Sequence, residues 1–542
     1  MKVIAAIDAD LETTPLGTAS RLADALAGRP VLRRTVERVV RAGSLDEVVV
    51  VCPQNQVRAC ADLIDGLKAT VVPHPGVGPP FRSLTRTARK WSLEGWRGGL
   101  GGATALDEYA DCAVLASLAK QSRADALWIC GGAAAVVDPA LIDAMVDHYR
   151  RIGHTMRFTF ATVPPGLAGL IMETALLDDL GKQNIPPGWL LAYKPDAPQM
   201  DLAFKDCCFP ASAAMRHASG RVMVDTRRTF DEVTDLLAAH ADPDGETVGK
   251  WLIERAATDV PPLPREVEIE LTTEDQLSRT PLRPRGECVP ARGPIDPQRI
   301  AEVAEALAAY DDSLVVLGGF GEPLLHPQFG EICRLLSGSG VYGVAVRTNA
   351  IALDEAAIET LLDCRLDLIN VLLDAWTEEL YQRLNPDRTL AAVLHNLDEL
   401  NKARETAGQV EPLIVPQMTK SVETVSELDA FFDGWIRGVG CAVVEGYSHY
   451  AGQLPDRSLV DMSPPTRTPC RRIRSRCLIL ADGRMTRCDQ DFTGCTAVGS
   501  LAETTLADLW QGSALTTART HHAAGRYDDL PLCGTCTEWH RP

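Results

Sequence analysis

The chain has 542 residues, of which 46% are hydrophobic and 23% charged, the balance of an ordinary globular protein. This length exceeds one ordinary domain, so we expect about two to four domains. The formal net charge of −19 argues against binding to nucleic acid or to an anionic membrane, because phosphate binding needs clustered lysines and arginines.

The first residues, MKVIAAIDADLE, lack the basic start and the long apolar run of a signal peptide, and they predict a β-strand instead. No stretch approaches about eighteen uninterrupted apolar residues, the length that a membrane-spanning helix needs. We therefore expect no membrane span, and a cytoplasmic location follows from that expectation.

Apolar strand patterns alternate with amphipathic helices over the first 255 residues. Residues 2–8, 47–53 and 124–130 predict buried strands, whereas residues 31–43 and 139–153 predict helices that end in glycine. Such an alternation is typical of an α/β layer with a mainly parallel sheet.

A proline-rich segment at residues 258–266 predicts a domain boundary. A second series of strands and helices follows it, from the strand pattern VEIEL at 267–271 to the strand pattern LDLINVLLDA at 366–375. Repeated βα units of this length predict a full or partial (β/α) barrel, which binds ligands at the carboxyl ends of its strands.

The distribution of the 16 cysteines is uneven, since six of them fall between residues 470 and 542. In a reducing compartment such thiols are free, catalytic or metal-bound rather than paired. The other ten lie in apolar stretches and are expected to be buried. The tail shows little apolar core of its own, and small domains of that kind need a metal or another staple. We place the predicted domains at 1–257, 265–462 and 466–542.

Residues 265–460 resemble the radical S-adenosylmethionine (SAM) family. The stretch GGFGEPLLHP at 318–327 is similar to the family's glycine-rich Glu-Pro motif, and VRTNA at 346–350 to its later Thr-Asn strand end. The resemblance implies that Gly319, Gly321 and Glu322 hold the methionyl amino group of SAM, with Asn349 also at the cofactor.

The thiols that define that family are missing where the resemblance places them. Its first strand reads Glu-hydrophobic-Thr and is followed by a CxxxCxxC loop that binds a [4Fe–4S] cluster. Here ELT stands at 270–272, and the three cysteine positions fall at Asp275, Arg279 and Leu282. Arginine cannot ligate iron, leucine has no donor atom, and one carboxylate does not replace three thiolates. Cys288 is a single thiol nearby. We therefore expect no catalytic cluster and doubtful binding of SAM.

The tail resembles the SPASM or twitch extension that follows many such barrels. The matching features are a cysteine, a strand with Asp-Gly, a second cysteine, a TLADLW helix and a closing CGTC. The resemblance implies that four thiolates close an auxiliary [4Fe–4S] cluster, while tetrahedral zinc stays an alternative for the same four ligands. The implied ligands are Cys470, Cys488, Cys533 and Cys536. Cys477 and Cys495 are interpreted as spare or buried.

Residues 1 to about 250 resemble the cytidylyltransferases of nucleotide-sugar and spore-coat polysaccharide pathways, which have a glycosyltransferase-A-like fold. In register with that family, the basic positions that grip a triphosphate fall at Asp10, Pro15 and Ala19. The metal-binding aspartate falls at Ala133. Nucleotidyl transfer needs cations at the phosphates and a carboxylate-held Mg²⁺, so we expect this activity to be absent.

Three hypotheses follow for the function. The first is a catalytically silent pseudoenzyme or scaffold, linked to sugar or surface-glycan modification, that binds a protein partner or a small sugar or nucleotide. The second is an active radical SAM enzyme or nucleotidyltransferase with unusual ligands. The third is an electron-transfer protein that works through the tail cluster.

Overall fold

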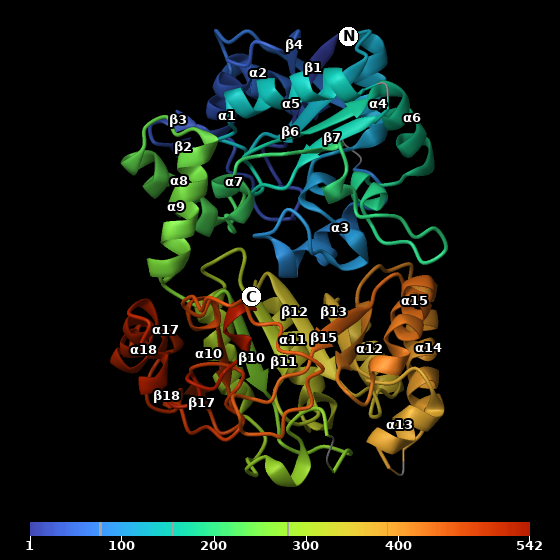
Figure 1. Cartoon of the computed structure of the whole chain (residues 1–542), viewed down its shortest axis with the longest axis vertical. Coiled ribbons are helices and arrows are strands. Elements are labelled where there is room, and N and C mark those ends of the chain that lie inside the picture. The colour runs from blue at the N-terminus through green and yellow to red at the C-terminus, as the bar shows by residue number, and fades with distance from the viewer. Residues whose placement is uncertain (75–77, 154, 279–280, 387, 542) are drawn as a thin grey trace. The chain divides into compact units, whose positions relative to one another are not determined.

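The computed structural model describes residues 1–74, 78–153, 155–278, 281–386 and 388–541. The chain divides into two compact units, Met1–Ala256 and Ala257–Pro542. Each unit is built on one large sheet, and each is described by itself below (Figure 1). Among the helices of the described residues, none combines the length and the apolar character that crossing a bilayer requires.

The first unit contains a seven-stranded sheet in the order β5-β4-β1-β6-β8-β7-β9. Strands β5, β4, β1 and β6 are parallel, and β8 turns the sheet antiparallel. In sheet order the strands are β5 Thr70–His74, β4 Glu47–Pro53, β1 Val3–Asp8, β6 Ala126–Gly131, β8 Leu170–Glu173, β7 Phe158–Ala161 and β9 Cys208–Phe209. A two-stranded ribbon, β2 Ala25–Leu26 and β3 Arg29–Pro30, lies apart from this sheet.

Helices cover both faces of the first sheet, because its central strands are apolar on both sides. Along β1, Val3, Ala5 and Ile7 pack into one core, while Ile4 and Ala6 pack into the other. Helices α1, α2, α5, α8 and α9 contribute to the first core, and α4 and α6 to the second. The helices of this unit are α1 Val31–Val40, α2 Val57–Leu63, α3 Arg82–Arg89, α4 Cys112–Gln121, α5 Pro139–Ile152, α6 Thr174–Gln183, α7 Ala213–His217, α8 Arg227–Ala239 and α9 Gly245–Thr258.

The second unit contains a nine-stranded sheet in the order β15-β14-β13-β12-β11-β10-β16-β17-β18. The strands from β15 to β16 are parallel, and β17 and β18 continue the sheet antiparallel. In sheet order they are β15 Val443–Gly446, β14 Leu413–Lys420, β13 Leu368–Leu372, β12 Gly343–Thr348, β11 Leu314–Gly318, β10 Glu266–Glu270, β16 Arg476–Ile479, β17 Arg484–Thr486 and β18 Ala497–Ser500.

Helices follow the strands of the second sheet and cover its outer face, which makes a partial barrel. They are α10 Pro297–Leu307, α11 Phe329–Gly338, α12 Glu355–Asp363, α13 Glu378–Leu384, α14 Leu390–Thr406, α15 Leu428–Val439, α16 Arg472–Ser475, α17 Leu506–Gln511 and α18 Ser513–Ala523. In β10, Val267 and Ile269 pack into the core with these helices, while the alternating Glu268 binds Arg347 with an N–O distance of 2.9 Å. The predicted α/β class is confirmed, with a partial rather than a full barrel.

The cysteine-rich tail shares its core with the barrel, which the sequence did not indicate. Strand β16 pairs with β10, and Cys477 and Ile479 belong to the barrel core together with Trp510 of α17. The Trp510 indole also donates a hydrogen bond to the carbonyl of Pro261 at 2.8 Å. The apolar side chains of the tail therefore need no core of their own, because the barrel supplies one.

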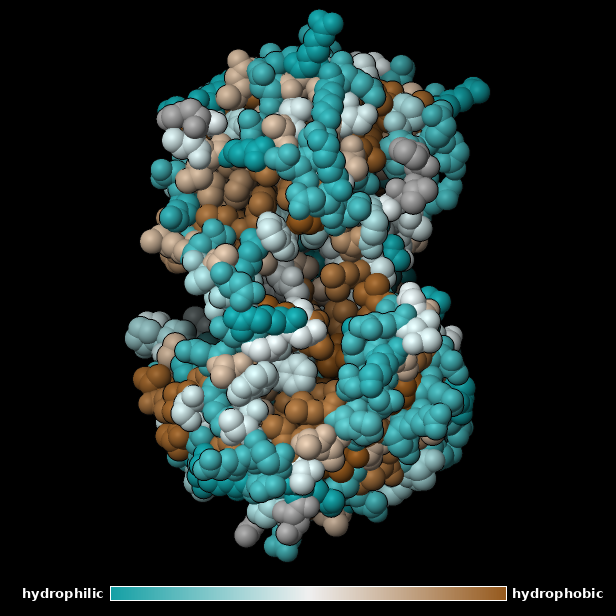
Figure 2. All heavy atoms as spheres, turned by 90° about the vertical axis from the view of Figure 1, so that its right-hand side faces the viewer, coloured by the Kyte–Doolittle hydropathy of each residue, from teal (hydrophilic) through white to brown (hydrophobic). Residues whose placement is uncertain are grey.

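The surface of the chain is mixed in character. The face shown in Figure 2 is largely hydrophilic, with hydrophobic residues exposed in several patches. Among the described residues, the most exposed large apolar side chain is Phe204, at 82%. Scattered exposed apolar residues are normal for a folded chain.

Candidate functional site

The four cysteines predicted as tail ligands line one pocket. Cys470 lies two residues before the short helix α16, Cys488 follows β17, and Cys533 and Cys536 lie in the loop near the C-terminus. Counting its opening to solvent, the pocket holds about 450 Å³ of space that no atom occupies. The structure therefore brings together thiols that are up to 66 residues apart along the chain, since Cys470 and Cys536 both line it.

Burial keeps these thiols in a neutral state in the absence of a metal. It raises the pKa of the Cys470 and Cys533 thiols, the pKa of Cys488 goes well above its usual range, and the pKa of Cys536 rises to about 12. Repulsion from Cys470 adds to the rise at each of the other three. Thiols that repel one another when charged need a bound cation to become thiolates, which a metal centre provides.

Three hydrogen-bond donors on the lining of this pocket find no acceptor among the residues that the structure describes. Nε of Arg467, Nε of Arg472 and Nε2 of His522 are buried and lack a hydrogen-bond partner within the described part of the chain. Nη1 of Arg472 binds Asp489, and Nη2 of Arg467 donates to the backbone carbonyl of Cys533 at 2.7 Å. Buried N–H groups without acceptors are rare and call for an explanation, and sulfur atoms carrying negative charge would satisfy them. The residues of the pocket thus fit an anionic iron–sulfur cluster.

The two remaining tail cysteines lie elsewhere. Cys477 is buried in β16 within the barrel core, and Cys495 is exposed beside Asp491, whose carboxylate accepts its backbone N–H at 3.1 Å. Neither lines the pocket. In the described ranges, no group of three or more His, Cys, Asp or Glu side chains converges closely enough to hold a single metal ion.

At the carboxyl end of β11, the two predicted cofactor glycines are close to the end of β10. Gly319 has a φ of +80°, and a Cβ added there would lie 2.5 Å from the Cβ of Glu270. A Cβ at Gly321 would collide with the carbonyl oxygen of Thr272. Both positions need glycine for the packing of the strand ends, whether or not a cofactor binds.

Glu322 is fully buried and joins the ends of β11 and β12. Its carboxylate accepts hydrogen bonds from the Thr348 hydroxyl at 2.6 Å, the Asn349 N–H at 2.8 Å and the Leu324 N–H at 3.2 Å. Burial raises the pKa of Glu322 to about 7, although the hydrogen bonds from Thr348 and Asn349 and the charge of Arg285 oppose the rise. The carboxyl group is therefore partly protonated near neutral pH.

Asn349 is held by the loop that follows β10. Its amide donates to Asp275 at 3.0 Å and to the Gln276 side chain at 3.2 Å. All four residues predicted for SAM thus lie at the carboxyl ends of β11 and β12, and each has a structural role there. A role in binding SAM stays a prediction.

The loop after β10 carries an ion pair where the family resemblance places thiols. Asp275 and Arg285 are both buried, and their side chains bind each other directly. Leu282 is 3% exposed and belongs to the barrel core. Arg279 lies outside the described residues. Cys288 is exposed, with its Sγ 3.1 Å from the carbonyl oxygen of Arg285.

A second buried pair closes the same end of β10. Arg292 binds both carboxylate oxygens of Glu270, at 2.8 and 2.9 Å, and both side chains are almost fully buried. Arg283 likewise binds Asp374 beyond the end of β13. Three arginines from one loop region therefore fill the carboxyl end of the barrel with paired positive charge, an arrangement for which the sequence carried no distinctive motif.

In the first unit, the positions that correspond to the triphosphate grip make local contacts. Asp10 accepts hydrogen bonds from the backbone of Glu12 and from the Gln56 amide, at 2.8 and 3.0 Å. The Pro15 carbonyl accepts a hydrogen bond from Arg86 at 3.4 Å. Ala19 pairs with Thr13 in an isolated bridge. Ala133 is buried in the first of the two cores of this unit, the one that contains Val3, Ala5 and Ile7 of β1.

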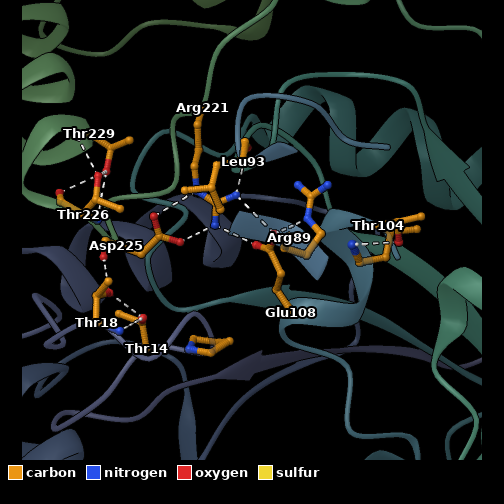
Figure 3. Close-up of polar contacts among 12 residues, drawn as sticks. Thr14, Thr18, Arg89, Leu93, Thr104, Glu108, Arg221, Asp225, Thr226 and Thr229 are labelled. Atoms are coloured by element: carbon orange, nitrogen blue, oxygen red, sulfur yellow. Dashed lines mark hydrogen bonds and ion pairs between the residues drawn. The ribbon is translucent and has the colours of Figure 1, made fainter. Parts of the chain in front are cut away.

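Next to this loop, four charged side chains form a buried network (Figure 3). Arg221 binds Asp225 and also Glu108, whose other oxygen accepts from Arg89 at 2.8 Å. The Thr18 hydroxyl donates to the backbone carbonyl of Asp225 at 2.7 Å, which ties the first loop to the network. Burial alone would raise the pKa of Glu108, but Arg221 and Arg89 outweigh it and hold that pKa below its usual range.

Two family models match the C-terminal half of the chain. Residues 288–428 match the radical SAM superfamily, and residues 470–537 match SPASM, an iron–sulfur cluster-binding domain. The C-terminal half therefore contains a radical SAM domain followed by a SPASM domain. Proteins of these families bind [4Fe–4S] clusters and SAM.

The chain is also similar to individual proteins. A relative from Treponema pallidum (strain Nichols), described as an uncharacterized protein, is 26% identical over 254 residues, which is 45% of this chain and 67% of that protein. Among solved structures, BtrN in complex with AdoMet and 2-DOIA is 16% identical and has a TM-score of 0.34 over 51% of this chain and 93% of that chain.

Two further structures are similar to parts of the chain. Streptococcus suis SuiB bound to S-adenosylmethionine is 13% identical, with a TM-score of 0.39 over 54% of this chain and 79% of that chain. A cytidylyltransferase from Leptospira borgpetersenii serovar Hardjo-bovis is 17% identical, with a TM-score of 0.31 over 47% of this chain and 93% of that chain.

Proposed function

We propose that this protein is a non-catalytic iron–sulfur protein, in which a radical SAM-type barrel without a cluster of its own carries one [4Fe–4S] cluster in the tail. The observation that carries the proposal is a contrast within the second unit. Four thiols line one pocket in the tail, whereas at the barrel Asp275 is bound to Arg285 and Leu282 is buried in the core.

The charges at the carboxyl end of the barrel argue against a cluster there. Iron in a [4Fe–4S] cluster needs thiolate ligands, and Asp275 and Leu282 at the described motif positions offer none. Asp275 is the one donor among the described positions of the missing motif, and Arg285 and Asn349 already occupy its oxygens. A barrel of this kind can still serve as a rigid scaffold.

The surroundings of Glu322 weaken any binding of SAM. The family resemblance assigns the amino group of SAM to Glu322, and a carboxylate binds an ammonium group best when it is ionised and has free lone pairs. Here its oxygens already accept three hydrogen bonds, and burial raises its pKa to about 7. We therefore propose that SAM binds weakly or not at all.

The tail pocket supports an iron–sulfur cluster over zinc. Tetrahedral zinc would require four sulfur atoms about 2.3 Å from one point. The four thiols here line one pocket, but among the described residues no three ligand side chains converge on a single point, which suits a group of several atoms. The unpaired donors of Arg467, Arg472 and His522 also suit a cluster whose sulfurs accept hydrogen bonds.

The biological role that we propose is that of a scaffold or binding protein in sugar or surface-glycan modification, with a protein partner or a small sugar or nucleotide as its ligand. This part rests on the sequence resemblance of the first 250 residues. Asp10 stands where that family has a phosphate-binding cation, so we expect no Mg²⁺-dependent release of pyrophosphate from CTP.

The test is the iron, zinc and acid-labile sulfide content of the full chain purified without oxygen. We expect about four irons and four sulfides per chain, the content of one cluster. A Cys288→Ser variant is the matched control and should keep the same content, because that thiol does not line the tail pocket. About eight irons would refute the silent barrel, and one zinc without iron would refute the cluster.

A second assay addresses catalysis directly. The reduced protein is mixed with SAM, and 5′-deoxyadenosine is quantified over time. We expect none above the level of a sample without protein. Repeated turnovers would show that the chain is an enzyme with unusual ligands. If the tail cluster is present and exchanges electrons rapidly with a redox protein, electron transfer replaces the scaffold role.

A further inference from the structure

His522 is a buried histidine on the lining of the four-cysteine pocket. It lies on α18, is 1% exposed, and packs edge-on against Tyr527 with ring centroids 5.1 Å apart. Its Nδ1 accepts the backbone N–H of Cys470 at 3.2 Å. The ring is thus fixed by one polar contact and one aromatic contact, beside a residue predicted to be a cluster ligand.

The contact at Nδ1 determines which nitrogen carries the proton. A neutral imidazole has one acceptor and one donor nitrogen. Since Nδ1 accepts from Cys470, the proton is on Nε2, and this N–H has no hydrogen-bond partner among the described residues. A buried donor without a partner destabilises the fold, so an acceptor in the pocket would be stabilising.

We propose that Nε2–H of His522 donates a hydrogen bond to a sulfur atom of the tail cluster, either a bridging sulfide or a ligand thiolate, and thereby raises the reduction potential of the cluster. This inference rests on the proposed tail cluster. Reduction adds an electron to the cluster, so a donor at sulfur stabilises the reduced form more than the oxidised form. His522 is in this sense a positioning and tuning residue rather than a ligand.

The surroundings of His522 support this role. Nε of Arg467 and Nε of Arg472 are two further buried donors on the same lining without partners in the described ranges. Two of these donors flank Cys470 and the third lies on α18, and no acceptor from the described chain serves any of them. A cluster with four thiolate ligands carries negative charge and offers several sulfur acceptors at once.

The test compares His522→Phe and His522→Gln with a control on the same helix, His521→Phe. His521 does not line the pocket and lies 3.7 Å from Asp529. For each full-length protein, iron content is measured and the cluster is titrated reductively with detection by electron paramagnetic resonance. Phenylalanine removes the donor at similar volume, whereas glutamine keeps an N–H donor.

We expect the phenylalanine variant to keep its iron and to be harder to reduce. The loss of one hydrogen bond should lower the equilibrium constant for reduction about tenfold, which is about 59 mV for a one-electron couple. The glutamine variant should recover part of the shift, and the His521 control should match the wild type. A full iron content with an unchanged potential would overturn the inference and leave the cluster proposal intact. A wild type without iron would overturn both.

A second measurement covers the case in which the phenylalanine variant loses its iron. The wild type is labelled with ¹⁵N-histidine, and pulsed resonance of the reduced cluster measures the coupling to nitrogen. A weak coupling that disappears in His522→Gln supports a hydrogen bond. A strong coupling would make His522 a ligand and would overturn the inference, as would the absence of any coupling.

Discussion

Replacement of Arg221 by methionine tests the buried charge network of the first unit. Arg221 is 3% exposed and holds two carboxylates, Glu108 and Asp225, which are 3% and 2% exposed. After the replacement Arg89 still pairs with Glu108, whereas Asp225 loses its ion pair with Arg221. Methionine keeps most of the volume, so the effect reports the charge rather than a cavity.

The expected cost is set by the buried carboxylate that remains. Removing one partner of a buried ion pair destabilises a protein by about 3–5 kcal/mol. Burial already raises the pKa of Asp225. When the folded state raises the pKa of a carboxyl group, the protein becomes less stable as the pH rises, because the folded state must then bury the charge. The deficit of the variant should therefore be largest above neutral pH and smaller near pH 5.

The assay is pulse proteolysis across a urea gradient, with peptides from residues 1–256 quantified by mass spectrometry. Arg29→Met is the control, because Arg29 is 59% exposed and its pair with Glu37 should contribute less than about 1 kcal/mol. A deficit for Arg221→Met no larger than that of the control, or one that does not change with pH, would refute the reasoning.

Three further predictions concern the second unit. Burial raises the pKa of Glu322 from 4.5 to about 7, so the free energy of unfolding of the wild type should fall by about 3 kcal/mol as the pH rises through this window. Glu322→Gln should flatten this dependence of the unfolding free energy on pH, as measured by urea titrations. Gly321→Ala should destabilise the unit by about 1–3 kcal/mol in the same assay, because its Cβ would collide with the carbonyl of Thr272; an unchanged midpoint would contradict this. Cys536→Ser should lower the iron content of the purified protein and Cys477→Ser should not. Equal losses of iron would refute the assignment of the metal centre to this pocket.

Apolar alternation is enough to predict most of the fold. The pattern of β1, in which Val3, Ala5 and Ile7 pack on one side and Ile4 and Ala6 on the other, follows from burial on both faces of a parallel sheet. The same reasoning finds the strands of the barrel. It could not determine that β16 joins β10, because strand pairing between distant segments leaves no local pattern.

The candidate site could be predicted only where residue type and spacing carry chemistry. The thiols that line the tail pocket follow from the positions of cysteines in the sequence. The donors of Arg467, Arg472 and His522 do not, because arginine and histidine are usually exposed and their burial depends on packing. The pairing of Arg285 with Asp275 was likewise hidden, since opposite charges ten residues apart in a loop have many possible partners.

The pairing of β16 with β10 means that the four-cysteine pocket and the barrel depend on one continuous sheet. Glu266 stands opposite Arg476, and Ile269 opposite Ile479, so a tail exchanged from another protein must supply a strand in this register as well as its cysteines. A chain shortened before β16 would leave the backbone of β10 open at the sheet edge, where it could join strands of other molecules. Modular transfer of the tail alone is therefore disfavoured, because its four pocket thiols lie outside β16 and depend on that strand for their place beside the barrel.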